Sequence, residues 1–408
     1  MRSNYKQLGQ FIESINIRNK DLAVDTLLGV SIEKCFIPSI ANTVGTDMSN
    51  YKIVRKLQFA YGPVTSRNGD KISVALLEDY DAAIVSQAYI VFEIINHEEL
   101  DPEYLMMWLR RPEFDRYARF MSHGSARETF DWDEMCETEL PVPSIEKQRE
   151  IVKEYNTVVN RIKLNEQLIQ KLEETAQALY KHWFVDFEFP DEKGQPYKSS
   201  GGKLIYDSEL DADIPEHWSS GRLDQFVTLS QGQVINAKTR HLVVKQGLPL
   251  LKITDLFNGT ATMFIDSEKV DKKNIASKED LIYTRTGQTG FIFRNKEGVV
   301  HNNCFKILPI KNKLNKEYLF WFFNNPNTRR TMVELAAGSA QTDLTHSAFF
   351  TVSLVEPDNN TLALFENISV RICKTQLLKE KQNIQLEKLK TILLSKTSVV
   401  NNKNEVVI

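Results

Sequence analysis

Residues 140–190 read LPVPSIEKQREIVKEYNTVVNRIKLNEQLIQKLEETAQALYKHWFVDFEFP, and this stretch predicts one long helix. Pro141 and Pro143 end the preceding segment, and Ser144 can cap the helix that follows. No Gly or Pro interrupts residues 144–189. At about 1.5 Å per residue, a helix of this length measures roughly 60 Å.

Apolar residues recur along this stretch, mostly at steps of three and four, as in a coiled-coil seam. They are Val152, Tyr155, Val159, Ile162, Ile169, Leu172, Ala176, Leu179 and Trp183. A seam this long has to be buried against another long helix. The sequence offers a second one at residues 358–396, after Pro357, with the apolar series Leu362, Phe365, Ile368, Ile372, Leu378, Leu386, Leu389 and Leu393.

The two helical stretches belong to a repeat that covers the whole chain. The residue numbers of Pro357 and Pro143 differ by 214, and so do those of Leu354 and Leu140. The same difference, which we call the repeat offset, relates Tyr318-Leu319 to Tyr104-Leu105 and Gly338-Ser339-Ala340 to Gly124-Ser125-Ala126. The chain is therefore one unit written twice. This is a duplicated domain and not a solenoid, whose repeats are roughly 20–50 residues long.

The repeat predicts an α+β protein with pseudo-twofold internal duplication. We expect tandem α/β domains at residues 1–143 and 214–357, long antiparallel helices at 144–189 and 358–396 that form a coiled coil, a linker at 190–213 and a flexible tail at 397–408. Strands are predicted at residues 26–31, 71–77, 82–95, 250–254, 280–293 and 304–310, helices at 101–111 and 315–324, and a boundary loop at 201–218.

The composition is that of an ordinary globular protein, with 42% apolar and 26% charged residues in 408. We expect no membrane span, because no run of eighteen apolar residues occurs. The four cysteines stand alone, which favours a reducing cytoplasm over disulfides or structural zinc. A net charge of −3 does not by itself indicate a nucleic-acid partner.

The motifs of common catalytic sites are absent from the sequence. It lacks a phosphate-binding P-loop, the glycine pattern of dinucleotide-binding folds, a serine nucleophile motif and a zinc-peptidase motif. Asn325-Pro326 is followed by Asn327, so it does not fit the Pro-Pro-aromatic motif of amino-methyltransferases. We therefore predict no catalytic and no metal-binding residues, which favours a recognition or scaffolding protein.

The order of these parts resembles the specificity subunit of type I restriction–modification enzymes. The resemblance covers essentially the whole chain, and its motifs are Leu140-Pro-Val-Pro-Ser-Ile-Glu-Lys-Gln-Arg-Glu-Ile151, Trp183-Phe-Val-Asp-Phe-Glu-Phe-Pro190, Ile214-Pro-Glu-His-Trp218 followed by Leu223, and Gly338-Ser339-Ala340. One departure is that the second helix opens with Pro357-Asp-Asn-Asn360 instead of a Pro-x-x-Glu-Gln sequence.

The resemblance implies a non-catalytic subunit in which two target-recognition domains each read half of a bipartite sequence in double-stranded DNA. The helices would space the domains and dock two methyltransferase subunits, through which restriction subunits join. S-adenosylmethionine, ATP and Mg would then be bound by the partner subunits, with no cofactor in this chain. Such a complex works in the cytoplasm of a bacterium or archaeon.

Polar and basic loop residues are the candidates for DNA contacts, although Gly, Ser, Thr and Asn clusters are also ordinary turn formers. They are Ser66, Arg67, Asn68, Ser122, His123, Ser125 and Arg127 in the first domain, and Lys238, Arg240, Arg285, Thr286, Gln288, Ser339, Gln341 and Thr342 in the second.

Residues near the helix ends are the candidates for partner docking. They are Gln148, Ile151, Trp183, Phe184, Phe187, Leu389 and Leu393. Trp183, Phe184 and Phe187 could equally form a core beneath the helix end. The mostly polar segments 163–167 and 375–383 interrupt the seam, and we expect their residues to be exposed toward the DNA spacer or a partner.

Two other functions remain open at this point. The chain could be a coiled-coil scaffold without DNA readout, but matched globular domains of this size are more than a scaffold needs. It could also be a self-contained DNA methyltransferase or nuclease, which the absent cofactor and base-flipping motifs disfavour.

Overall fold

The computed structural model describes residues 5–39, 45–66, 68–69, 71–124, 127–311, 313–336 and 343–397. Five of the predicted DNA-contact residues lie outside the described residues, namely Arg67, Ser125, Ser339, Gln341 and Thr342, and so does the predicted tail from residue 398 onward. The chain divides into two compact units, Met1–Glu166 with Glu380–Ile408 and Gln167–Lys379.

The first unit is built on an antiparallel four-stranded sheet. Its strands, in spatial order, are β2 (Ile12–Ile15), β9 (Ile90–Ile94), β6 (Phe59–Tyr61) and β7 (Val74–Leu76). Two-stranded ribbons accompany it: β1 (Tyr5–Gln7) with β10 (Glu139–Pro141), β3 (Leu28–Val30) with β4 (Phe36–Pro38), and β5 (Lys52–Arg55) with β8 (Ala82–Val85). The short helices are α1 (Pro102–Leu109), α2 (Pro112–Met121) and α3 (Trp132–Glu137).

The second unit repeats this scheme with a larger accessory sheet. Its four-stranded sheet has the order β14 (Val227–Gln231), β22 (Cys304–Pro309), β19 (Leu281–Thr284) and β20 (Ile292–Phe293). The accessory sheet contains β15 (Val243–Val244), β17 (Phe264–Ile265), β16 (Leu248–Leu251), β21 (Gly298–Val300) and β18 (Ile275–Ala276). Ribbons pair β11 (Leu204–Asp207) with β12 (Ala212–Pro215) and β13 (Ser219–Arg222) with β23 (Ser353–Glu356). The short helices are α5 (Ile253–Asn258), α6 (Lys316–Asn324), α7 (Pro326–Ala336) and α8 (His346–Phe349).

The equivalent elements of the two units begin a fixed distance apart in the sequence. Helices α6, α7 and α8 start one repeat offset after α1, α2 and α3, and β22 starts one repeat offset after β9. The first residue numbers of β19 and β6, however, differ by 222, so segments of different length precede and follow this strand in the two copies. The duplicated, mixed helix and strand architecture that the sequence predicted is confirmed.

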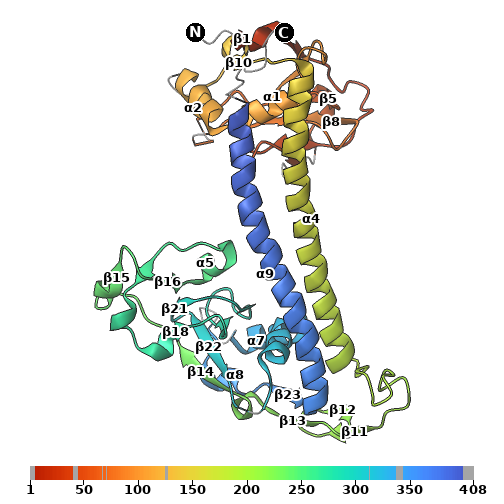
Figure 1. Cartoon of the computed structure of the whole chain (residues 1–408), viewed down its shortest axis with the longest axis vertical. Helices are drawn as coiled ribbons and strands as arrows, with labels where there is room; N and C mark the ends of the chain where they lie inside the picture. The colour runs from red at the N-terminus through yellow and green to blue at the C-terminus, as the bar shows by residue number, and fades with distance from the viewer. Residues whose placement is uncertain are drawn as a thin grey trace, which may run out of the picture. The chain divides into compact units, whose positions relative to one another are not determined.

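Two long helices complete the units, α4 (Ile145–Phe184) and α9 (Asn359–Lys396). In the first unit, Lys396 near the end of α9 forms an ion pair of 2.8 Å with Glu154 near the start of α4. In the second unit, Gln376 of α9 donates a hydrogen bond of 3.2 Å to the carbonyl of Ile169 in α4. The start of one helix therefore lies beside the end of the other, which confirms the antiparallel pairing (Figure 1).

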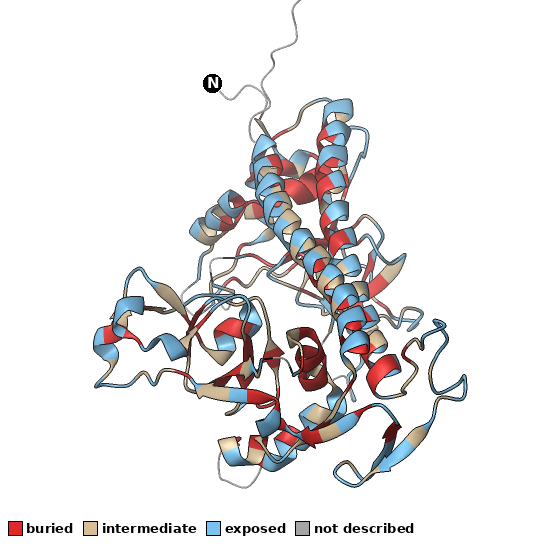
Figure 2. Ribbon diagram, turned by 60° about the horizontal axis from the view of Figure 1, so that its bottom comes forward, coloured by how far each residue is buried: buried red, intermediate tan, exposed pale blue. Residues whose placement is uncertain are grey.

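The helix seam differs in part from its prediction. Ile368, Leu378 and Leu389 are exposed, whereas Ser369 and Gln376 are buried. Polar groups can take seam positions because they find partners there: Ser369 Oγ accepts a hydrogen bond of 2.9 Å from Trp321 Nε1. Figure 2 shows many exposed residues along both long helices.

The predicted exposure of residues 163–167 is also wrong at one position. Asn165 is only 2% exposed, and its Nδ2 donates hydrogen bonds to Asn383 at 2.7 Å and to Gln382 at 3.1 Å. The polar interruption of the seam therefore contains a buried amide cluster. The buried Nδ2 of Asn165 is tolerated because it is hydrogen-bonded to both neighbours.

Several element boundaries were predicted incorrectly. Residues 82–95 and 280–293 each form two strands instead of one, and the boundary loop 201–218 contains the β11–β12 hairpin. Pro112 does not simply end a helix but opens α2, since proline suits the first turn. Helix α4 ends at Phe184 and not at 189, and the backbone turns at Phe187, whose φ is 60°.

Each unit has its own aromatic core. In the first, the rings of Phe59 and Phe92 stack with centroids 4.7 Å apart. In the second, Phe184 packs against Tyr318 and Phe365, with ring centroids 4.8 and 5.0 Å away. In the part of the chain that the structure describes, no helix is long and apolar enough to cross a membrane.

Candidate nucleic-acid interface

In the first domain, the loop after β6 is tied to the segment that precedes α3. Val64 and Thr129 form an isolated antiparallel bridge, and the Phe130 amide donates a hydrogen bond of 2.8 Å to the Pro63 carbonyl. Thr65 Oγ1 also donates to Ser122 Oγ at 3.0 Å. Two polar segments that are far apart in the sequence, both predicted to contact DNA, therefore lie side by side.

The second domain has the same backbone connection. Thr286 and Asp343 form an antiparallel bridge, and the Leu344 amide donates a hydrogen bond of 2.9 Å to the Arg285 carbonyl. Asp343 lies one repeat offset after Thr129, and Thr286 follows Val64 by the same interval as β19 follows β6. We call this pair of contacts the loop clamp. It holds the predicted recognition loop in place in both domains.

The candidate residues around the first clamp differ in their exposure and in the hydrogen bonds that they make within the chain. Ser66 is exposed, and Asn68 Nδ2 donates a hydrogen bond of 3.3 Å to the Val64 carbonyl. The hydroxyl of Ser122 donates to the Ala118 carbonyl at 2.6 Å, so Ser122 stabilises the end of α2. His123 and Arg127 are both exposed. Among the described residues Arg127 makes no ion pair, so it is available to a phosphate or a base edge.

Arg285 has a structural role in the second clamp. Its guanidinium forms an ion pair of 2.6 Å with Asp343 and donates a hydrogen bond of 3.2 Å to the Leu344 carbonyl. The side chain is only 12% exposed and lies over the ring of Phe305. Arg285 therefore orders the loop, and the exposed Gln288 is the predicted residue at its tip.

Thr286 and His346 add to this local network. Thr286 Oγ1 donates a hydrogen bond of 3.0 Å to Asp343. Burial, together with the positive charge of Arg285, lowers the pKa of His346, so this imidazole is neutral near pH 7. The positive charge beside the clamp is thus neutralised by Asp343, and His346 adds none.

Lys238 and Arg240 lie just before β15, on the accessory sheet of the second unit. Both are exposed, and neither forms an ion pair within the described ranges. A short turn of 3-10 helix, Arg240–Leu242, places Arg240, and the Lys238 carbonyl lies 2.9 Å from His241 Nδ1. Such uncompensated exposed cations are suited to DNA phosphates.

Most predicted docking residues are buried inside the units. Gln148 Nε2 donates to the Glu99 and Pro143 carbonyls at 2.9 and 2.8 Å, and its Oε1 accepts from the Asp101 amide at 2.9 Å. Ile151, Trp183, Phe184 and Leu393 are core residues, Phe187 packs against the core, and Leu389 is exposed. The packing that the structure shows for the buried set is that of a core, so their contact with a partner stays a prediction.

Two contacts near the clamps were missed in the sequence. Arg119 pairs with Glu128, one residue before Thr129, and Arg329 lies 3.4 Å from the ring centre of Phe291. The sequence repeat could have pointed to the clamp, because Thr129 and Asp343 occupy equivalent positions in the two copies. No group of three His, Cys, Asp or Glu side chains that could hold a metal ion occurs among the described residues.

Comparison with known proteins gives consistent matches. The family model described as the type I restriction modification DNA specificity domain matches residues 36–174 and 215–361. The HindI specificity subunit of Haemophilus influenzae is 24% identical over 400 residues, which cover 84% of this chain and 86% of that protein. The MjaIX specificity subunit of Methanocaldococcus jannaschii is 23% identical over 316 residues, covering 74% of this chain and 69% of that protein.

One solved structure supports the fold. The type I restriction–modification S subunit from M. genitalium superimposes with a TM-score of 0.59, at 13% identity, over 97% of this chain and 96% of that chain.

Proposed function

Because the chain belongs to the type I restriction–modification DNA specificity family, we propose that its two domains each read one half of a split DNA sequence. The chain is a specificity subunit, non-catalytic by family. In this proposal the first domain reads one half through the loop after β6 and the segment around His123 and Arg127. The second reads the other half through the loop after β19 and the cations Lys238 and Arg240.

The observation that carries this proposal is the loop clamp. The same bridge, Val64 with Thr129 and Thr286 with Asp343, recurs in two domains whose loops differ in length and sequence. A fixed backbone support with a variable loop is what a recognition domain needs, because rigid elements position the groups that read base edges. Exposed Lys238 and Arg240 supply phosphate contacts that fix register, and exposed Arg127 contacts a base edge in the half read by the first domain.

The partners and cofactors follow from the same family membership. We propose that the helix pair docks two methyltransferase subunits and that restriction subunits join through them. S-adenosylmethionine, ATP and Mg would be held by those subunits. The assembled complex would act in the cytoplasm of a bacterium or archaeon.

The test is to co-express this chain with the methyltransferase subunit of its own system and to map methyladenine across the host genome. We expect a split motif, with two short defined halves around a gap of fixed length. The same preparation without this chain should leave the genome unmethylated at that motif.

Two results would count against the proposal. A stable complex that methylates without sequence preference would mean that the domains do not read bases. Binding of the methyltransferase with no DNA affinity at any salt concentration would favour a scaffold, since phosphate-driven binding strengthens steeply as salt is lowered.

A further inference from the structure

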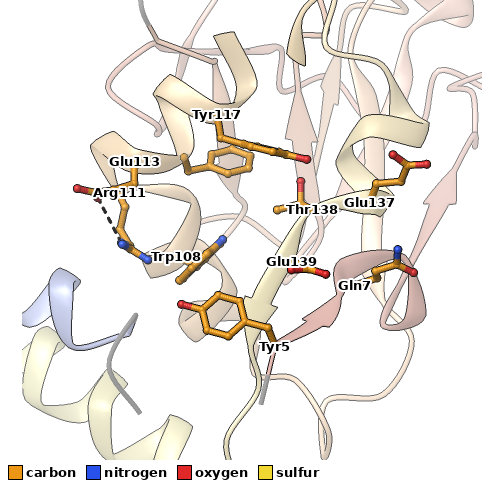
Figure 3. Close-up of a pocket in the computed structure, with 10 residues that line it drawn as sticks. Tyr5, Gln7, Trp108, Arg111, Glu113, Tyr117, Glu137, Thr138 and Glu139 are labelled. Atoms are coloured by element: carbon orange, nitrogen blue, oxygen red, sulfur yellow. Dashed lines mark ion pairs between the residues drawn. The ribbon is translucent and has the colours of Figure 1, made fainter. Parts of the chain in front are cut away.

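A cavity of about 750 Å³ lies in the first unit (Figure 3). Its lining comes from the β1–β10 ribbon, the α1–α2 corner and the segment that joins α3 to β10. Trp108 and Tyr5 form one side, with ring centroids 6.1 Å apart, and Tyr117 lies opposite (Figure 3). A cavity of this size accommodates a small molecule or one side chain with its backbone.

Two buried hydrogen-bond donors in this cavity have no acceptor among the described residues. They are Nε1 of Trp108, which is 9% exposed, and Nε of Arg111, which is 7% exposed. The guanidinium of Arg111 lies over the Trp108 ring, 4.3 Å from its centre, and its Nε is 3.4 Å from Glu113 without hydrogen-bond geometry. In Figure 3 the indole nitrogen points into the cavity, toward Thr138.

Buried donors without acceptors are costly, and most native proteins satisfy them. The indole N–H of Trp108 points into the cavity, so a ligand oxygen bound there could accept from it. The base of the cavity is therefore built for a carbonyl or carboxylate oxygen.

The mouth of the cavity is negatively charged, whereas the base presents a hydrogen-bond donor. Glu137 and Glu139 are exposed, and within the described ranges neither forms an ion pair. Glu113, by contrast, is paired with Arg111 and Arg116, so the uncompensated charge of the mouth comes from Glu137 and Glu139. A negative mouth of this kind repels DNA phosphate and attracts a cation. The aromatic face of Tyr117 also favours a cationic group.

The second unit lacks these groups at the equivalent positions. The positions one repeat offset after Trp108, Arg111, Glu113, Tyr117, Glu137 and Glu139 hold Phe322, Asn325, Asn327, Thr331, Thr351 and Ser353. Every charge of the cavity is absent there, although the surrounding helices are repeated. The site therefore occurs in one half of the duplicated chain only.

We propose that this cavity, the Trp108 pocket, binds a basic segment of a partner protein. An arginine or lysine side chain would lie between Trp108 and Tyr117 with its charge at Glu137 and Glu139. A backbone carbonyl of the same segment would accept from Trp108 Nε1. Because the second unit lacks the site, one such segment binds per chain, which makes two otherwise equivalent partner positions distinguishable.

The test uses the full chain with ¹⁵N-labelled tryptophan, whose five indole N–H resonances are resolved by transverse-relaxation-optimised NMR. The W108F variant assigns the Trp108 resonance. The probe is the tripeptide acetyl-Ala-Arg-Ala-amide, and its control is the same peptide with neutral citrulline in place of arginine. We expect a saturable shift of the Trp108 resonance alone, with roughly tenfold weaker binding of the citrulline peptide, which corresponds to about 1.4 kcal/mol.

Two double variants complete the design. E137Q/E139Q keeps the shape of the mouth and removes its charge, and it should weaken the arginine peptide by roughly tenfold. T351A/S353A changes the equivalent positions of the second unit and should leave binding unchanged. Glu137, Glu139 and Thr351 are exposed and Ser353 is half-buried, so a spectrum like that of the original chain serves as the check that each variant is folded.

The proposal is overturned if the folded chain shows no Trp108 shift, if the citrulline peptide binds equally well, or if E137Q/E139Q has no effect. It is also overturned if a DNA duplex, and not the peptide, shifts this resonance. We expect E137Q/E139Q to bind the peptide more weakly and to bind DNA like the original chain. This result would show that the pocket acts independently of DNA reading.

Discussion

The guanidinium of Arg285 pairs with Asp343 and donates to the Leu344 carbonyl, and its side chain is largely buried over Phe305. Arg240, which precedes it in the same domain, is exposed and makes no ion pair in the part of the chain that the structure describes. The two arginines have the same chemistry, but their surroundings give them different roles. Arg285 stabilises the clamp, whereas Arg240 is available to a ligand.

Substitution of Arg285 by alanine should destabilise the second unit. It removes an ion pair and a hydrogen bond and leaves the Asp343 carboxylate without its ion-pair partner, at a cost of about 1–3 kcal/mol. Chemical unfolding followed by far-ultraviolet circular dichroism measures this loss. The matched R240A variant should unfold like the original chain, and equal stability of R285A and R240A would contradict a structural role for Arg285.

The double variant K238A/R240A should affect DNA binding and not stability. If each cation neutralises one phosphate, the slope of log K against log salt becomes shallower by roughly two units, at about 0.9 per contact. Titration of a labelled duplex at several salt concentrations gives this slope. An unchanged slope would place these cations away from the DNA.

At the scale of elements, an equivalent hydrogen bond in each domain holds the strand that leads into its long helix. The Tyr104 hydroxyl donates to the Pro141 carbonyl at 3.1 Å, and Tyr318, at the equivalent position of the second copy, donates to the Val355 carbonyl at 2.7 Å. Glu317 of α6 accepts a hydrogen bond of 2.6 Å from Ser369 in α9. These buried contacts set the direction in which the long helix leaves its domain.

Asp358 caps α9 and gives a pH-dependent contribution to stability. It accepts hydrogen bonds from the Thr361 amide at 2.9 Å and from Trp218 Nε1 at 3.0 Å. Burial by itself would raise the pKa of Asp358, but the hydrogen bonds from Thr361, Trp218 and Asn360 outweigh it and lower the pKa. The capping energy is therefore fully present above the ordinary carboxyl pKa and is lost as the pH falls through the lowered one.

The variant D358A should cost about 0.5–2 kcal/mol at neutral pH, the usual effect of removing an N-cap. The difference in unfolding free energy between the original chain and D358A should shrink as the pH falls below about 4. Urea unfolding at pH 7, 5 and 3 measures it. A difference that grows on acidification would mean that the charge of Asp358 is unfavourable in the folded state.

Asn165 of α4 provides a second test at this scale. Its amide donates to Gln382 and Asn383 of α9 within the first unit. Replacing Asn165 by alanine should cost about 1 kcal/mol, because two partly buried acceptors lose their donor. The adjacent, exposed Glu166 is the control, since E166A should leave the unfolding free energy unchanged. Equal effects of the two substitutions would show that the amide cluster contributes nothing specific.

At the scale of the whole molecule, duplication gives one chain two similar domains with different loops. The clamp is kept in both, while the charges of the Trp108 pocket occur in the first only. Features shared by the two halves serve the common architecture, and features present once can give the halves different partners or different bases.

Substitutions in one domain should therefore alter one half of the recognised sequence. We expect R127A to relax the motif half read by the first domain, and K238A/R240A to weaken methylation without changing that half. Genome-wide methyladenine mapping with each variant makes the comparison. Relaxation of both halves by R127A would contradict independent reading by the two domains.

The sequence by itself determined the duplication, the two long helices and the mixed α/β domains, because periodicity and a constant repeat offset are properties of the chain order. It also located the polar loops. It did not identify α2 or α7, since a proline after a helix can end it or open the next one.

Only the tertiary structure decided which of the polar residues are available. Arg285 and Gln148 are occupied by contacts with Asp343 and Asp101, and Trp183 and Phe184 are covered by the core. The Trp108 pocket likewise joins β1, α1 and β10, which are far apart in the sequence. The physical reason is that burial and hydrogen-bond pairing depend on long-range packing, which a local pattern does not encode.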